Sequence, residues 1–358
     1  MRFAPTTEQL EFAEAVKGLL ADTCTPESVR SAWGGEVGEH TALGTGDGRI
    51  RAAWDALTEM GVLGLTVPES NGGLAMSDDD LVGIAIECGY AGLPDPLVAT
   101  AGVAAGALRS IGGPSDVADD WLTRIANGAS VVTGFGPDPV VSAASSSDGL
   151  LLFGHDPVSG AGEVGVRILE PGDVRLELLE SVDGSRALCR VEAIADAGVP
   201  LADGEEARDI AAMAFDRAAV YDAALMVGLS RRMLDLTVEY VSERKQFGVP
   251  IGSFQAVKHH LANAGLEVEF AEPLVRNAAH LLASATPADR AVAVSMAKQR
   301  ASLAAVTASE TTLQCHGAIG YTVEADLHLF MKRSWALAHT NGDADWHRAR
   351  VRSDLLGR

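Results

Sequence analysis

The residues best suited to binding chemistry lie in one short stretch, VSERKQFGVPIGSFQAVKHHLA, which interrupts a long Ala-rich helical pattern. Arg244, Lys245, Phe247 and Gln255 surround a Gly/Pro-rich turn. An arginine and free backbone amides beside an aromatic ring can bind a phosphate that carries a ring system. A basic turn that caps the preceding helix would use the same residue types, because Lys and Arg favour helix C-termini. The stretch alone leaves both interpretations open.

A second candidate segment, QCHGAIGYTVEADLHLFMKRSWAL, begins at Gln314. Gly317 and Gly320 would end a helix and let a ligand approach the backbone closely. Gln314 supplies an amide with both a donor and an acceptor. A glycine helix cap followed by a further helix explains the same residues without any ligand.

Composition excludes several functions. The chain has 358 residues and a formal charge of -21, so its field repels nucleic acid and anionic membranes. Its four cysteines have no metal-ligand spacing, which indicates reduced thiols and no metal site: Cys24, Cys88, Cys189 and Cys315. The N-terminal stretch has neither a basic region nor a long apolar run, so we expect a soluble cytoplasmic protein without a membrane span.

The pattern of apolar residues predicts three domains. Helical spacing from Thr7 to about residue 125 predicts an N-terminal helical domain over residues 1–128. Short Val-, Leu- and Ile-rich runs separated by Gly-containing turns predict β-hairpins in a middle domain over residues 129–205. Helical spacing returns over residues 206–358. Both candidate segments fall in this last domain, so its helices must position them.

Sequence signals predict where the long helices of this domain begin and end. One helix is expected over Ala207 to Ser242, and a second, bent by Pro273, from Gln255 to about Ser284. Thr286 followed by proline predicts the N-cap of a third helix, which runs to about Cys315.

Together, the two candidate segments resemble the C-terminal domain of the acyl-CoA dehydrogenase family. The stretch GVLGLTVPESNGGLAMSDDDLVGIAIECGYAGLPDPLV is similar to the family's N-terminal segment, and the order of the three blocks agrees. The resemblance implies a mainly α fold with a β middle domain: an N-terminal helical domain, a small β-barrel-like domain and a C-terminal four-helix bundle.

The resemblance also implies FAD as the cofactor. In this family the ADP half of the flavin nucleotide crosses a subunit interface, where it meets residues of both motifs. The positions that match are Arg244, Phe247, Gln255, Gln314, Cys315, His316, Gly317 and Ala318. The family usually passes its electrons to an electron-transfer flavoprotein.

The family's catalytic base is absent at the matching positions. A glutamate normally removes the α-proton while a hydride leaves for the flavin. The two known base positions fall on Asn341 and Ala218, whose side chains cannot act as a base. Asp216, Asp343 and Asp345 are the nearest carboxylates, and for these we expect solvated or capping roles.

The flavin-ring segments of the middle domain are also eroded, with Thr133 as a possible remnant of the first. Half of a flavin site is therefore kept while the base is lost. This pattern resembles the non-catalytic subunit of actinobacterial heterotetrameric acyl-CoA dehydrogenases, which act with a catalytic partner subunit on CoA thioesters of steroid side chains such as cholesterol catabolites. A self-sufficient flavoenzyme with an aspartate base and a flavin-free scaffold are the alternatives.

Overall fold

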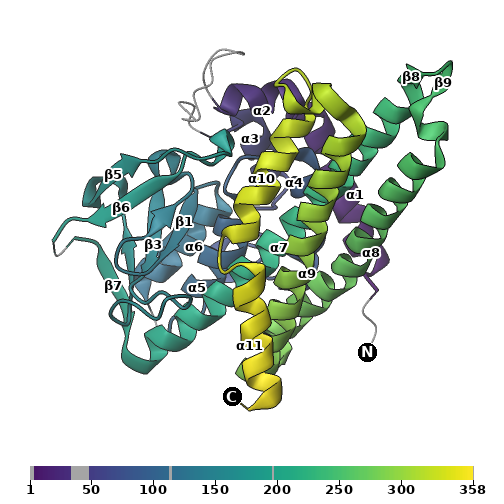
Figure 1. Ribbon diagram of the computed structural model, residues 1–358. Coiled ribbons are helices and arrows are strands. Elements are labelled where there is room, and N and C mark those ends of the chain that lie inside the picture. Colours follow the sequence, from purple (N-terminus) through teal and green to yellow (C-terminus); the bar gives the residue numbers. More distant parts are fainter. Residues whose placement is uncertain (1–3, 34–47, 113–114, 196, 358) are drawn as a thin grey trace.

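The computed structural model describes residues 4–33, 48–112, 115–195 and 197–357. The first part of the chain is helical, and in Figure 1 these helices lie above and beside the β-strands and behind the long helices of the last part of the chain. Their bounds are α1 (Thr7–Thr23), α2 (Pro26–Trp33), α3 (Arg51–Glu59), α4 (Asp78–Ala91), the π-helix η2 (Val98–Ala104), α5 (Ala105–Leu108) and α6 (Asp116–Ala126).

The middle of the chain forms two small sheets that enclose a separate apolar core. The strands are β1 (Val131–Phe135), β2 (Val140–Val141), β3 (Gly149–Phe153), β4 (Gly165–Leu169), β5 (Val174–Leu178), β6 (Cys189–Ala193) and β7 (Val199–Asp203). One sheet has the order β1-β3-β4-β7 and the other β2-β6-β5. This core consists mainly of branched side chains from both sheets, including Val132, Leu150 and Val191.

The prediction of successive hairpins is wrong at one end of the larger sheet. Strand β1 pairs with β3 in parallel, with Val131 opposite Gly149, so the chain must cross over between them. The crossover contains β2, which pairs with β6 of the second sheet. Strand β7 was not predicted, because its sequence VPLAD lacks a clear apolar alternation.

The last part of the chain consists of long helices that run side by side in Figure 1. Their bounds are α7 (Gly204–Glu243), α8 (Gln255–Ser284), α9 (Pro287–His316), α10 (Leu327–His339) and α11 (Ala344–Leu356), and a hairpin of β8 (Lys245–Gln246) and β9 (Val249–Pro250) joins α7 to α8. Helix α7 has 40 residues and spans roughly 60 Å.

The predicted boundaries of α8 and α9 are confirmed, whereas α7 begins at Gly204, before the predicted start at Ala207. Helix α8 begins at Gln255 and ends at Ser284, and it continues through Pro273 without interruption. The Thr286 hydroxyl accepts a hydrogen bond from the backbone N–H of Asp289, which is the predicted N-cap of α9.

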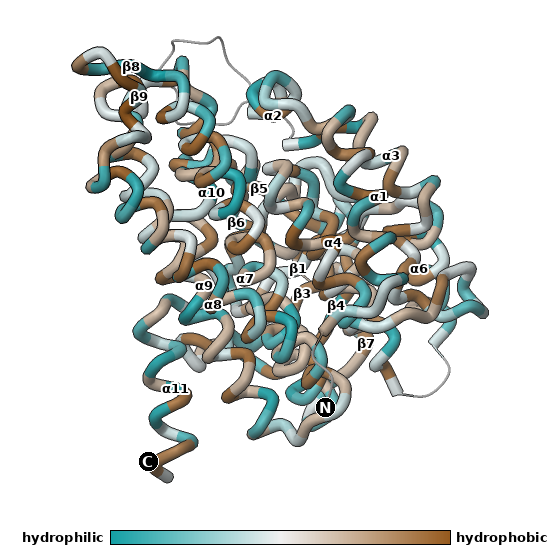
Figure 2. The backbone as a smooth tube through the Cα atoms, turned by 90° about the vertical axis from the view of Figure 1, so that its right-hand side faces the viewer, coloured by the Kyte–Doolittle hydropathy of each residue, from teal (hydrophilic) through white to brown (hydrophobic). Residues whose placement is uncertain are grey.

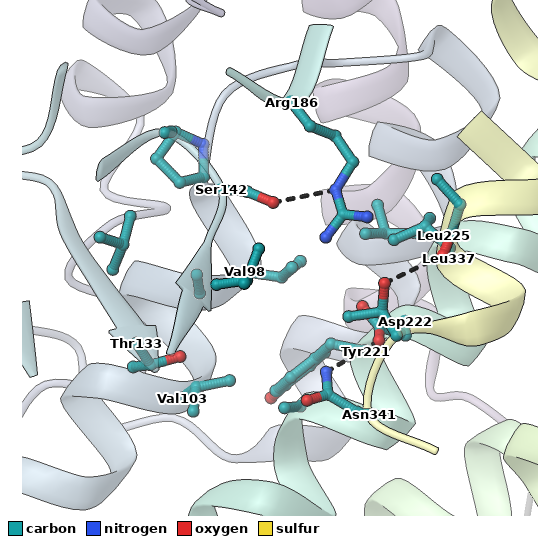
Figure 3. Close-up of a pocket in the computed structure, with 18 of the residues that line it drawn as sticks. Val98, Val103, Thr133, Ser142, Arg186, Tyr221, Asp222, Leu225, Leu337 and Asn341 are labelled. Carbon is teal, nitrogen blue, oxygen red and sulfur yellow. Dashed lines mark hydrogen bonds between the residues drawn. The ribbon is translucent and has the colours of Figure 1, made fainter. Parts of the chain in front are cut away.

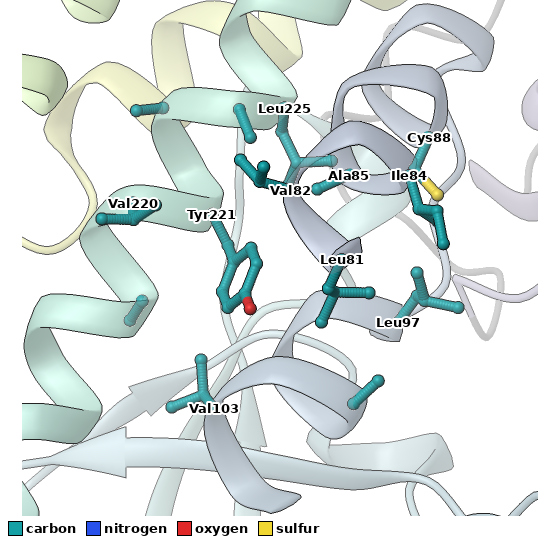
Figure 4. Close-up of a cluster of buried hydrophobic side chains, with 14 of the residues drawn as sticks. Leu81, Val82, Ile84, Ala85, Cys88, Leu97, Val103, Val220, Tyr221 and Leu225 are labelled. Atoms are coloured by element: carbon teal, nitrogen blue, oxygen red, sulfur yellow. The ribbon is translucent and has the colours of Figure 1, made fainter. Parts of the chain in front are cut away.

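The centre of α7 is buried on all sides because it lies between the N-terminal helices and the rest of the bundle. Tyr221 donates a hydrogen bond of 2.6 Å to Asp78 at the start of α4, and Gly102 of η2 packs on the Tyr221 ring. Figure 4 shows this ring among apolar side chains from both parts of the chain. Figure 2 shows that brown, apolar residues recur along the packed helices, whereas teal residues recur along the outer turns. One continuous core therefore fixes the long helices against the N-terminal domain.

Candidate functional site

The predicted ADP-side residues of the first motif lie at the hairpin between α7 and α8. Arg244 is exposed and ends α7, and its carbonyl accepts a hydrogen bond from the Ile251 N–H at 2.8 Å. Gln255 is exposed at the first position of α8. Figures 1 and 2 both show β8 and β9 projecting from one corner of the molecule.

Phe247 stands at the tip of this hairpin. Its side chain is 94% exposed, and its backbone has a φ of 52°, a conformation that side-chain-bearing residues rarely adopt. Gly248 has a φ of 81°, so both central residues have the positive φ of a two-residue hairpin turn. Exposure of the ring and strain in the backbone both cost free energy, so the fold of this chain alone does not explain an aromatic residue at this position.

The second motif lies at the C-terminal end of α9, close to the last turns of α7. Gln314 and Ala318 are exposed, Cys315 is half-buried, and Gly317 has a φ of 64° at the cap of the helix. The His316 ring is buried against the Tyr240 ring, with 4.5 Å between their centroids. The structure therefore places both motifs at the same end of the helical bundle.

The side chain of His316 has an internal role. Its Nδ1 atom lies 2.9 Å from the Thr312 carbonyl, and the Tyr240 hydroxyl donates to the His316 carbonyl at 3.3 Å. Burial lowers the pKa of His316, since the charged imidazolium would lose water. His316 can consequently offer a ligand its neighbouring backbone more easily than its ring.

A cavity of about 700 Å³ lies between the middle domain and the long helices. Figure 3 shows side chains from η2, β1, α7 and the segment after α10 around it. The Thr133 side chain lines this cavity from β1. A cavity of this size can hold a drug-sized organic molecule.

Both expected base positions line this cavity. Ala218 is 7% exposed on α7. Asn341 has a φ of 53°, and its Nδ2 donates a hydrogen bond of 2.9 Å to the Asp222 carboxylate. The backbone carbonyl of Asn341 lies 2.9 Å from the Nε2 of His347. In the family this turn carries the catalytic base. Here the turn is fixed, because the Asn341 side chain is hydrogen bonded to Asp222.

Asp222 is the carboxylate of this cavity that the sequence analysis missed. It lies four residues after Ala218, on the same face of α7, and its side chain lines the cavity. Burial raises its pKa, while Lys298 and the hydrogen bond from Asn341 oppose that shift. A search one helical turn beyond Ala218 would have found this residue.

Lys298 is a fully buried cation beside this site. Its Nζ donates hydrogen bonds to the carbonyls of Leu337, Ala338 and Gly342, at 2.9, 3.4 and 3.2 Å. Burial lowers its pKa to about 8, while the Asp222 charge acts in the opposite direction. Lys298 therefore ties the end of α10 to the turn that contains Asn341.

The other candidate carboxylates have structural roles. Asp216 is fully buried and accepts hydrogen bonds from Arg290 and Arg350, at 2.8 and 2.9 Å, so the expectation of a solvated or capping role is wrong for this residue. Asp343 accepts from the Trp346 N–H at 2.8 Å and caps α11, as expected. The side chain of Asp345 is 84% exposed.

Two further features of the described residues bear on function. No group of His, Cys, Asp or Glu side chains among them could hold a metal ion. None of the helices they form is both long enough and apolar enough to cross a bilayer.

The order of the domains and the cavity between them define a family. Residues 6–129 match the model of the acyl-CoA dehydrogenase N-terminal domain, and residues 208–356 match that of the C-terminal domain. The chain therefore belongs to the acyl-CoA dehydrogenase family, and the fold predicted from the sequence is confirmed.

Among its relatives is acyl-CoA dehydrogenase IpdE2 of Mycobacterium tuberculosis, which is 32% identical over 92% of each chain. Acyl-CoA dehydrogenase FadE34 of the same organism is 30% identical, over 96% of this chain and 47% of that protein. Similar solved structures include the ChsE4-ChsE5 complex from Mycobacterium tuberculosis, with a TM-score of 0.85 and 22% identity over 100% of both chains. The Tcur3481-Tcur3483 steroid acyl-CoA dehydrogenase has a TM-score of 0.83 and 23% identity over 98% of both chains.

Proposed function

We propose that this chain is the non-catalytic subunit of an FAD-dependent acyl-CoA dehydrogenase complex, in which it completes the FAD site of a catalytic partner subunit. The observation that carries the proposal is the position of the ADP-side residues. Arg244, Phe247 and Gln255 are exposed at one corner of the molecule, whereas the strands that border the chain's own cavity lie on the opposite side in Figure 1. Residues placed there are suited to a flavin nucleotide held mainly by another chain.

The chemistry of these residues fits the ADP half of FAD. Arg244 is a fixed-charge donor for the pyrophosphate, and the Phe247 ring is free to stack on a flat group. Gly317, with its positive φ, leaves the backbone at the end of α9 open to close approach. When bound, FAD supplies the acceptor for the hydride that leaves the substrate.

We further propose that the partner subunit carries out the α,β-dehydrogenation of a CoA thioester, with a steroid side-chain thioester as the substrate. This assignment is supported by the similarity to a steroid acyl-CoA dehydrogenase and to a two-subunit complex. An electron-transfer flavoprotein is the proposed electron acceptor. The lack of a base at Ala218 and Asn341 supports a partner that contributes the catalytic glutamate.

Co-expression tests the proposal. The chain is purified alone and with a catalytic homologue encoded beside it, and bound FAD and dehydrogenation with an artificial electron acceptor are measured for both. We expect flavin and activity only in the complex. Flavin and turnover in the lone chain would refute the proposal. If the catalytic homologue binds the same amount of FAD with and without this chain, the chain is a flavin-free scaffold.

A single substitution examines the cofactor role directly. Arg244→Ala in the complex should weaken FAD binding by about 1.5 kcal/mol or more, because a charge-assisted hydrogen bond to phosphate is lost. Arg175→Ala is the matched control, since the Arg175 side chain is 74% exposed on the middle domain. Equal FAD occupancy of the two variants at limiting FAD would remove Arg244 from the site.

One observation favours a second function, a self-sufficient flavoenzyme. Asp222 lines the cavity one helical turn from a known base position, and burial raises its pKa, as is common for a general base. Asp222→Asn separates the two functions: turnover that requires Asp222 in the lone chain would support this alternative, whereas unchanged turnover of the complex would support the non-catalytic role.

A further inference from the structure

The chain's own cavity contains two arginines that lack a carboxylate partner. Arg186 follows β5 and lies in the turn before β6, and Arg333 lies on α10; both line the cavity. Within the described part of the chain neither forms an ion pair. The Arg186 side chain donates from Nε to the Ser142 hydroxyl at 2.9 Å, and Arg333 donates from Nη1 to the Ser185 hydroxyl at 3.4 Å.

The position of Arg186 directs its free N–H groups into the cavity. In Figure 3 its guanidinium extends from the upper wall between Ser142 and Leu225, toward the space above Val98 and Tyr221. Burial lowers the pKa of Arg186; the charges of Asp183 and Asp222 oppose that shift, and the charge of Arg333 adds to it. Both guanidiniums line the same cavity, and an anion bound there would accept charge-assisted hydrogen bonds from the donors that they do not use within the protein.

The carboxylates around the cavity already have donors of their own. Asp95 forms a buried ion pair with Arg49 at 2.6 Å, and Asp222 accepts from Asn341. Two more are held by local turns: Asp156 accepts from the Val158 N–H, and Asp343 caps α11. Asp183 accepts from the N–H and the hydroxyl of Ser185 through Oδ1, whereas its Oδ2 is buried without a hydrogen-bond partner. Asp222 and Asp183 still attract Arg186 from a distance, but in the described residues no carboxylate reaches its guanidinium.

Most of the remaining wall is apolar. It is formed by side chains from η2, β1, α7 and α10, among them Leu97, Val98, Val103, Phe135, Phe215 and Leu337. A ligand that satisfies this cavity needs an apolar body and one anionic end, which is the composition of a free carboxylic acid. A phosphate or a nucleotide would leave the apolar wall without a partner.

We propose that this cavity binds an unesterified carboxylic acid with an apolar ring-containing or aliphatic body, whose carboxylate is held by Arg186 and Arg333. The inference rests on the proposed non-catalytic role, in which the cavity of this chain holds no flavin ring. In that role the chain carries out no chemistry at this cavity, so the bound acid is a ligand and not a substrate.

Isothermal titration calorimetry on the full chain, alone and in its complex, tests the proposal with acids of increasing size: cyclohexane carboxylate, adamantane carboxylate and cholate. Adamantane carboxamide is the uncharged counterpart and inorganic phosphate the simple anion. We expect at least one acid to bind, and adamantane carboxylate to bind about tenfold more tightly than its amide, since only the acid forms charge-assisted hydrogen bonds.

The variant Arg186→Gln should weaken acid binding about tenfold and leave amide binding unchanged. Arg190→Gln is the matched control, because Arg190 lies on β6 nearby with its side chain 51% exposed and paired to Glu177. Four results would each overturn the proposal. These are equal binding of acid and amide, binding of phosphate as tight as that of the acids, unchanged acid binding by Arg186→Gln, and no heat of binding from any acid at millimolar concentration. If Arg186→Gln fails to fold, the comparison of acid, amide and phosphate on the unmodified chain decides the question.

Discussion

Lys298→Met should destabilise the fold strongly while hardly changing the volume of the side chain. Lys298 is fully buried, and its ammonium group donates to three backbone carbonyls at the end of α10 and in the following turn. It also supplies the largest favourable charge interaction of Asp222. Methionine keeps most of the apolar stem but removes the ammonium donor from the three carbonyls, and it removes the positive charge that most opposes the raised pKa of Asp222.

The expected loss follows from these contacts. Removing one member of a buried charged cluster typically costs about 3–5 kcal/mol, because the remaining charge is uncompensated. The double variant Lys298→Met with Asp222→Asn leaves no such charge. Its loss should therefore be smaller than the sum of the two single losses by about 1 kcal/mol or more.

Urea denaturation at pH 7, followed by circular dichroism, measures these differences. Lys258→Met is the control, since Lys258 is exposed on α8 and its replacement should change the free energy of unfolding by less than about 0.5 kcal/mol. A loss below about 1 kcal/mol for Lys298→Met, or strict additivity in the double variant, would refute the coupling described for this cluster.

Three further predictions concern a buried histidine, helix glycines and the turn at Asn341. Burial lowers the pKa of His347 to about 3 from an ordinary 6.5, so the unfolded chain takes up a proton first and stability falls as the pH drops through this window. His347→Gln should reduce that slope by up to about 1.4 kcal/mol per pH unit in pH-dependent urea titrations, and an unchanged slope would contradict a buried neutral imidazole. Gly102→Ala should destabilise the fold by about 1–3 kcal/mol or more, because the added methyl group meets the Tyr221 ring. Gly265→Ala has open space around the added methyl group and should stabilise α8 by about 0.5–1 kcal/mol. Equal melting temperatures for the two variants would contradict the packing described at Gly102. Asn341→Ala in the complex should leave turnover with an artificial electron acceptor nearly unchanged, and a collapse of activity would place the chemistry on this chain.

The helical domain was predictable because its signals are local. Thr286 and the following proline define the start of α9 by hydrogen bonding and by a fixed φ, and the helix spacing after Gln255 needs no knowledge of distant residues. The pairing of β1 with β3 was not predictable in the same way. Parallel pairing depends on where the intervening chain crosses, and a short Val-rich run reads alike in either direction.

The candidate site shows the same limit. Asn341 and Ala218 could be identified by counting along the family pattern. The role of Asp222 depends on its contacts with Asn341 and Lys298, which lie far from it in the sequence. The ion pairs of Asp216 with Arg290 and Arg350 are likewise contacts between α7 and helices that follow much later in the chain. Partners that are distant in sequence leave no mark in the spacing around a single residue.

The exposed turn at Phe247 has a consequence for how the protein is made. An aromatic ring that is 94% exposed contributes little packing energy to its own fold beyond an edge contact with the Phe254 ring, and it leaves apolar surface open to other molecules. If a partner's nucleotide covers this ring, the risk of aggregation is confined to chains that have not yet assembled. Synthesis of the two subunits in equal amounts would then limit aggregation of the unassembled chain.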